Sequence, residues 1–225
     1  MEVKPFADRF YILDDTRVRQ FLFVGDREAL LIDTGFEDSH VYEQVRTITS
    51  LPVKVVLTHG DLDHCGGAGD FPVCYLHEND WPLLGDRSNG TIRSLKQGDV
   101  FSCAGYQLET IELPGHTWGS VAFIERKRRW LFSGDSVQKE GPIYMFGEHR
   151  NMAQYLLSLE KLMTFADSID WIFPCHGECP METVYIERNY RDAHSMMRQN
   201  YKGERHPKLP CMVYTCEWTK FYTDR

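Results

Sequence analysis

Two histidines and two aspartates lie within six consecutive residues of this chain, at His59, Asp61, Asp63 and His64. Imidazole nitrogens and carboxylate oxygens are the donors that bind divalent transition metals in proteins. A Gly-Gly pair follows one residue later, and glycine allows the backbone to approach closely. Bound cations remove the cost of crowding so many titratable groups together. The segment therefore predicts a metal site, with a solvated acidic loop as the alternative.

Further candidate ligands each follow a run of apolar residues. Asp33, His116, Asp135 and His176 stand just past such runs, as His59 does. In open α/β sheets, active sites gather beyond the carboxyl ends of the strands. One Asp or His at a strand end more often caps a turn, but five together predict a shared site.

Strands and helices that alternate along the chain must position these residues. Apolar and β-branched runs predict strands at 10–13, 19–24, 29–33, 53–58, 73–76, 106–113, 120–125, 129–133 and 170–174. Helical spacing predicts helices over 37–49 and from Asn151, where Asn151 and Gln154 resemble a capping box. The pattern over 178–200 is helical but less regular, and beyond Pro207 it becomes irregular. This alternation favours an α/β architecture.

Composition is that of a globular protein: 225 residues, 42% hydrophobic and 26% charged. The net charge of −8 argues against a nucleic-acid partner. No apolar run approaches the roughly 18 residues of a membrane span, and the N-terminus lacks the pattern of a signal peptide. We therefore expect a cytoplasmic protein without a membrane partner. Seven cysteines in such a chain are expected to be reduced thiols.

The motifs resemble those of the metallo-β-lactamase superfamily. His59-x-Asp61-x-Asp63-His64 matches that family's His-x-His-x-Asp-His with one change. The other matching motifs are Leu31-Ile32-Asp33-Thr34-Gly35, Gly115-His116-Thr117, Ser133-Gly134-Asp135 and Cys175-His176-Gly177. All of them occur in family order between Ala29 and Gly177.

The resemblance implies an α/β (α+β) four-layer αββα sandwich, formed as a single domain over 1–225 with a short C-terminal extension at about 180–225. It implies two divalent metal ions per chain, with zinc expected and iron or manganese as alternatives. One ion would be held by His59, Asp61 and His116, and the other by Asp63, His64 and His176. Asp135 would bridge the two ions, and Asp33 would support the ligands from behind. A hydroxide between the metals would attack a carbonyl or phosphoryl group, with Asp63 and Asp135 assigned to catalysis.

Asp61 stands where most of the family has histidine. An anionic oxygen makes the centre one charge less positive, so its bound water should be less acidic. Oxygen ligands also favour harder ions such as manganese or iron. Flavodiiron proteins of the same superfamily carry a carboxylate at this position, but they need a flavin domain for which this chain is too short.

Residues 136–150 connect Asp135 to the helix that begins after Asn151, and an apolar loop there predicts a pocket wall. The alternative is that its aromatic residues pack into the core. The expected substrate contacts are Trp118, Tyr144, Phe146, His149 and Arg150. The leading function is hydrolysis of a small ester, thioester or lactone, as in glyoxalase II and the lactonases. The alternatives are a di-iron oxidoreductase, a binding or regulatory protein with a weakened metal site, and, from the basic residues 126–129, a nuclease.

Overall fold

The computed structural model describes residues 1–224 and divides the chain into two compact units. Unit 1 comprises residues 1–111 and 123–125, and unit 2 comprises residues 112–122 and those from 126 onward. Both units contain strands and helices, which confirms the α/β class. The single domain over 1–225 stays a prediction.

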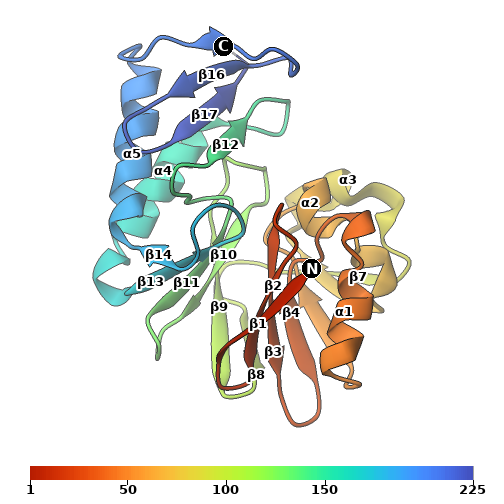
Figure 1. The fold of residues 1–225 in the computed structure, drawn as a ribbon. Helices are drawn as coiled ribbons and strands as arrows, with labels where there is room; N and C mark the ends of the chain where they lie inside the picture. Colours follow the sequence, from red (N-terminus) through yellow and green to blue (C-terminus); the bar gives the residue numbers. More distant parts are fainter. Residues whose placement is uncertain (225) are drawn as a thin grey trace. The chain divides into compact units, whose positions relative to one another are not determined.

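Unit 1 is built on a seven-stranded sheet whose strands follow one another in sequence order (Figure 1). The strands are β1 (Glu2–Ala7), β2 (Phe10–Asp14), β3 (Arg19–Val24), β4 (Ala29–Ile32), β5 (Val53–Val56), β6 (Val73–Leu76) and β7 (Thr91–Ser94). Neighbours from β1 to β4 are antiparallel, and those from β4 to β7 are parallel. The five inner strands were predicted. The edge strands β1 and β7 were not, because their exposed, polar residues give no apolar signal.

The two faces of this sheet are covered by different elements of unit 1. Helix α1 (Val41–Ile48) packs on one face, where Val41 and Val45 share a buried cluster with Leu22 and Leu31. On the other face, strands β8 (Val100–Cys103) and β9 (Tyr106–Glu112) form a hairpin. The Tyr106 ring lies 4.8 Å from the Phe23 ring.

The helix predicted over 37–49 begins later than expected. Residues Glu37–Ser39 form a 3-10 turn, and His40 then adopts a left-handed conformation (φ 50°) that separates this turn from α1. Two further short helices of unit 1 are α2 (Leu62–Cys65) and α3 (Trp81–Leu84). The prediction was therefore right about the helix and wrong about its start.

Unit 2 contains two parallel neighbouring strands, β11 (Trp130–Gly134) and β13 (Trp171–Pro174), with β14 (Met181–Glu182) antiparallel to β13. Strand β10 (Val121–Glu125) contributes residues to both units. Helices α4 (Met152–Met163) and α5 (Val184–Met197) pack against each other. Asn151 caps α4 as predicted, because its side chain accepts a hydrogen bond of 3.0 Å from the Gln154 backbone N–H.

Unit 2 also contains a four-stranded sheet. Its strands, in spatial order, are β12 (Pro142–Met145), β17 (Lys220–Thr223), β16 (Met212–Thr215) and β15 (Glu204–Arg205). The expectation of irregular structure beyond Pro207 was therefore wrong. These strands escaped prediction because they are short and their residues are mostly exposed or half-buried. Since β17 pairs in parallel with β12, the C-terminal residues are joined to the segment that follows Asp135.

Within residues 1–224, no helix combines the length and apolar character needed to cross a bilayer. The seven cysteines form no disulfide, which confirms the predicted thiols. Burial raises the pKa of Cys65 and of Cys74 to about 12. Both thiols are therefore protonated at neutral pH and pack as small apolar side chains.

Candidate metal centre

In unit 1, the predicted donors lie on the tight turn between β5 and α2. Asp61 is the residue before the first turn of α2, and its carbonyl accepts hydrogen bonds of 2.9 Å from the backbone N–H groups of His64 and Cys65. This turn brings the rings of His59 and His64 together, with their centroids 3.9 Å apart. Both histidines are buried. Adjacent donors in the sequence thus become adjacent donors in space.

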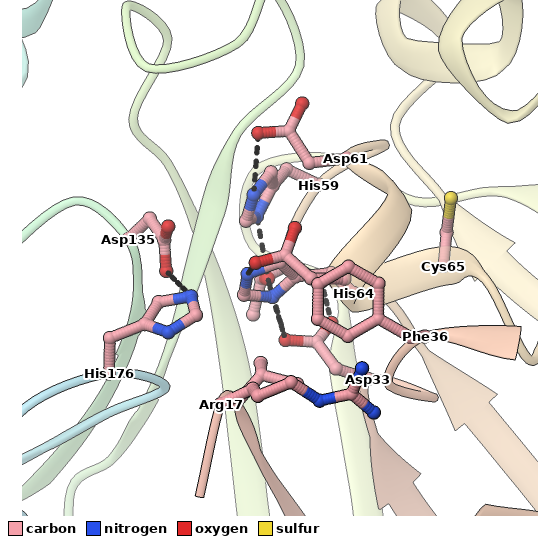
Figure 2. A network of polar contacts seen from close by, with 12 residues as sticks. Arg17, Asp33, Phe36, His59, Asp61, His64, Cys65, Asp135 and His176 are labelled. Carbon is pink, nitrogen blue, oxygen red and sulfur yellow. Dashed lines mark hydrogen bonds and ion pairs between the residues drawn. The ribbon is translucent and has the colours of Figure 1, made fainter. Parts of the chain in front are cut away.

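Each of these histidines faces one aspartate through its Nε2 atom. His59 Nε2 lies 3.4 Å from Asp61 Oδ2 (Figure 2), and His64 Nε2 lies 3.6 Å from Asp63 Oδ2. Two donors at about 2.1 Å from a tetrahedral ion are separated by about 3.4 Å. The distances in unit 1 therefore fit two donor pairs, each of which could share one ion.

Asp33 and Thr58 contact the two imidazole rings at Nδ1, the ring nitrogen that does not face Asp61 or Asp63. Asp33 Oδ2 lies 2.8 Å from His64 Nδ1 (Figure 2), and Thr58 Oγ1 lies 2.9 Å from His59 Nδ1. The Thr58 hydroxyl donates to Asp33 Oδ2 at 2.8 Å, and its backbone N–H donates to Asp33 Oδ1 at 2.7 Å. Contacts at Nδ1 favour the tautomer in which Nε2 carries the lone pair for a metal. Asp33 thus lies where the sequence predicted support, whereas Thr58 was missed although it directly precedes His59.

Unit 2 supplies the other three predicted donors, two of them from the ends of its strands. Asp135 directly follows β11, and His176 is the second residue after β13. Because β11 and β13 are parallel neighbours, their carboxyl ends meet at one edge. His116 lies in the turn after Gly115, whose φ is 136° and where an added Cβ would come within 2.3 Å of the Tyr155 backbone nitrogen. Only glycine fits there, which explains the Gly-His dipeptide of the motif.

The two carboxylate oxygens of Asp135 face two different histidines. Oδ1 lies 3.4 Å from His176 Nε2 (Figure 2), and Oδ2 lies 3.6 Å from His116 Nε2. Asp135 and His116 are buried, and the His176 side chain is 21% exposed. A carboxylate that presents one oxygen to each of two imidazoles has the geometry of a bridging ligand. The donor distances in unit 2 therefore also fit ligands that share an ion, as those in unit 1 do. The donor set of imidazole and carboxylate suits divalent transition metals.

The expected substrate contacts divide into three kinds. Trp118, which is 41% exposed, lies edge-on to His149 with the rings 6.1 Å apart. Arg150 instead donates to the His116 carbonyl and so supports the backbone of a candidate ligand. Tyr144 is exposed on β12 and packs edge-on against Phe146. Tyr144 therefore does not enter the core, and contact of these residues with substrate stays a prediction.

Known proteins are similar to this chain in sequence. The profile of the metallo-β-lactamase superfamily matches residues 13–73. A hydroxyacylglutathione hydrolase of Bdellovibrio bacteriovorus is 31% identical over 144 residues, which cover 61% of this chain and 55% of that protein. The acyl-coenzyme A thioesterase MBLAC2 of Gallus gallus is 26% identical over 210 residues, which cover 75% of each chain. The match to the bacterial relative thus spans little more than half of its length.

The fold is shared with solved structures. A metallo-β-lactamase family protein from Thermus thermophilus superposes with a TM-score of 0.69 at 21% identity, over 86% of this chain and 81% of that one. This likeness confirms the predicted fold. The residues matched by the family profile include Asp33 and the whole segment from His59 to His64. The chain belongs to the metallo-β-lactamase superfamily.

Proposed function

We propose that this chain is a metal-dependent hydrolase that cleaves a small ester or thioester at a centre of two divalent ions. One observation carries the proposal: four Nε2-to-carboxylate distances, two in each unit, fall between 3.4 and 3.6 Å. Ion-sharing ligands require this spacing. The relatives support the substrate class, since one is named for a glutathione thioester and the other for acyl-coenzyme A.

The proposed ligands form two groups. His59, Asp61 and His116 bind one ion, Asp63, His64 and His176 bind the other, and Asp135 binds both. The pairing inside each unit agrees with this division, because Asp61 faces His59, Asp63 faces His64, and the two oxygens of Asp135 face different histidines. When bound, two such ions supply Lewis acidity and an activated water at neutral pH.

The chain's own residues orient the ligands and receive the substrate. Asp33 and Thr58 fix both imidazoles of unit 1 through Nδ1, and Arg150 fixes the His116 carbonyl. The exposed Trp118 and the half-buried His149 form an aromatic pair close in sequence to His116 and Arg150. In this proposal, the pair contacts the apolar part of the acyl group.

Zinc is the proposed metal, because imidazole is a preferred zinc ligand and supplies four of the seven ligand side chains. Asp61 is the feature that favours iron or manganese instead, since it replaces an imidazole by a hard oxygen donor. Metal content measured on protein reconstituted with each ion separately distinguishes these choices.

The test combines metal analysis with a substrate panel. Protein loaded with zinc should hydrolyse one of a hydroxyacyl-glutathione, an acyl-coenzyme A, a lactone or a simple ester. Activity should disappear on chelation and return with metal, without flavin or an electron donor. Metal content near zero after reconstitution with zinc, manganese and iron would contradict the proposal. Reductant-dependent oxygen consumption without hydrolysis would favour the di-iron alternative.

A further inference from the structure

The segment that follows Asp135 is fastened by side chains from three elements of unit 2. We call this segment, residues 135–138, the Asp135 loop. Ser133 of β11 donates from its hydroxyl to the Val137 carbonyl at 3.2 Å. Tyr155 of α4 donates from its phenol to the Ser136 carbonyl at 2.9 Å. Asn189 of α5 binds Gln138. Every residue after Asp135 in this loop is therefore bound through its main chain to a side chain.

The contact between Asn189 and Gln138 is bidentate. The Gln138 backbone N–H donates to Asn189 Oδ1 at 2.9 Å, and Asn189 Nδ2 donates to the Gln138 carbonyl at 2.9 Å. The amide side chain thus replaces a neighbouring β-strand and satisfies both main-chain groups of Gln138. Two bonds fix the orientation of the Gln138 main chain as well as its position. Both residues are fully buried, so water does not take the place of either bond.

The side chain of Gln138 does not explain why the loop is held in this way. Both of its amide atoms are buried, and neither forms a hydrogen bond with any residue in the range 1–224. Burying an amide without hydrogen-bond partners is unfavourable. The main-chain contacts with Asn189 and Tyr155 hold the loop in place despite this cost. Because the unfavourable burial of the Gln138 amide occurs in the same loop as the candidate ligand Asp135, the position of this loop is important for that ligand.

Tyr155 keeps its proton over the whole working pH range. Complete burial raises the pKa of its phenol well above the usual value of 10.0, and the charges of Asp135 and Asp192 raise it further. The phenol is therefore a permanent donor to the Ser136 carbonyl. It is also buried on α4 beside the Phe221 ring of β17, at 6.0 Å between centroids, so it has little freedom to turn away.

We infer that Asn189 and Tyr155 are positioning residues that set the direction of the Asp135 carboxylate, and that α5 is therefore a working part of the metal centre. This inference rests on the proposed function, in which Asp135 binds both ions. A bridging carboxylate must keep each oxygen directed at its own ion. Contacts from supporting residues must hold that direction to within about 10–20°. A loop displaced at Ser136 or Gln138 turns one oxygen of Asp135 away from His116 or His176. Affinity for both ions then falls, although neither positioning residue touches a metal.

The test compares two loop variants with one control on the same helix. Asn189→Leu keeps the shape of the side chain and removes both hydrogen bonds, and Tyr155→Phe removes only the phenolic oxygen. The control Ala193→Gly weakens α5 at a buried position without touching the loop. For each protein, zinc affinity is measured by competition with a chromophoric chelator, and thermal unfolding is measured on the metal-free form.

We expect both loop variants to bind zinc about tenfold more weakly or worse. The control should unfold at a lower temperature than the wild type but bind zinc within about twofold of it. Wild-type affinity in both loop variants would overturn the inference, as would an equal loss in the control. If Asn189→Leu does not fold, Tyr155→Phe decides alone. A wild-type protein that binds none of zinc, manganese and iron refutes the proposed function and this inference together, whereas two bound ions with unaffected variants refute the inference alone.

Discussion

Asp33 Oδ2 lies 2.8 Å from His64 Nδ1, and both side chains are completely buried. Asp33 directly follows β4, whereas His64 lies on α2, so this contact joins the sheet of unit 1 to its candidate metal-binding turn. The backbone of Asp33 is left-handed (φ 60°). A non-glycine residue held in this conformation stores backbone strain, and such strain is found preferentially at functional sites. The contact orients one candidate ligand before any metal arrives.

The sharpest test of the ligand set concerns Asp61. Asp61→His should retain two ions, because imidazole can face His59 in place of the carboxylate and is the ligand most of the family uses there. The centre gains one positive charge, so the acidic limb of the pH–rate profile should shift to lower pH. Asp61→Ala should lose most binding of one ion. Metal stoichiometry and pH–rate profiles of the three proteins check this, and an Asp61→Ala protein identical to the wild type would remove Asp61 from the ligands.

His116 and His176 should each be needed for a different ion. Alanine at either position removes one donor facing Asp135, so metal content after reconstitution should fall from two ions per chain toward one. His40→Ala is the matched control, since that imidazole is exposed on unit 1. Elemental analysis of the three variants measures the effect. Two ions retained in His116→Ala and His176→Ala would contradict the assignment.

Thr58 should act through its hydroxyl rather than its methyl group. Thr58→Val keeps the shape and removes the contacts with Asp33 and His59 Nδ1. We expect zinc affinity to fall about 10- to 100-fold, as for other residues that orient metal ligands. Thr58→Ser keeps the hydroxyl and should stay close to the wild type. Chelator competition distinguishes the two variants, and equal affinities for both would assign Thr58 a packing role only.

Asp15 should contribute to the stability of unit 1 in a pH-dependent way. Burial acts to raise the pKa of its carboxyl, but hydrogen bonds from Ser39, from the backbone of Val18 and Arg17, and from the Arg17 side chain outweigh it, so the pKa is lowered. A lowered folded-state pKa gives stability that is present above the unfolded pKa of about 3.9 and is lost as pH falls through the folded value.

Replacing Asp15 by Asn should therefore destabilise the protein by about 1–2 kcal/mol at pH 7. The difference between the two proteins should shrink as the pH falls below about 4. Urea unfolding of metal-free protein at several pH values measures it. Asp26→Asn is the control, because its carboxylate is 80% exposed and forms only a surface ion pair with Arg9. A difference that does not change with pH would contradict the charge-based explanation.

Local patterns predicted the parts of the site that lie close together in the sequence. The motif from His59 to His64 follows a buried apolar strand, and its spacing alone indicated a shared metal site. The strands β4, β5 and β11 were predicted because buried parallel strands consist of continuous apolar residues. Most helix and strand ends were correct to within one or two residues for the same reason.

Contacts between distant segments could not be predicted in this way. The bidentate contact of Asn189 with Gln138 joins residues 51 positions apart, and a single asparagine inside a helical pattern carries no signal of its partner. The strands β16 and β17 are recognisable only through their pairing with β12, because most of their residues are half-buried or exposed. The role of Thr58 likewise depends on Asp33, which the chain brings back from 25 residues away.

The parallel pairing of β12 with β17 also sets an order of events during synthesis on the ribosome. All seven strands of the first sheet, and the donors His59 to His64, are made before residue 95 leaves the peptidyl-transferase centre. Strand β12, which follows the Asp135 loop, obtains its hydrogen-bonded neighbour only after Lys220–Thr223 has been translated and has emerged. The nascent chain therefore presents four of its seven candidate ligands early, and the sheet that follows Asp135 is completed only after all seven have been made.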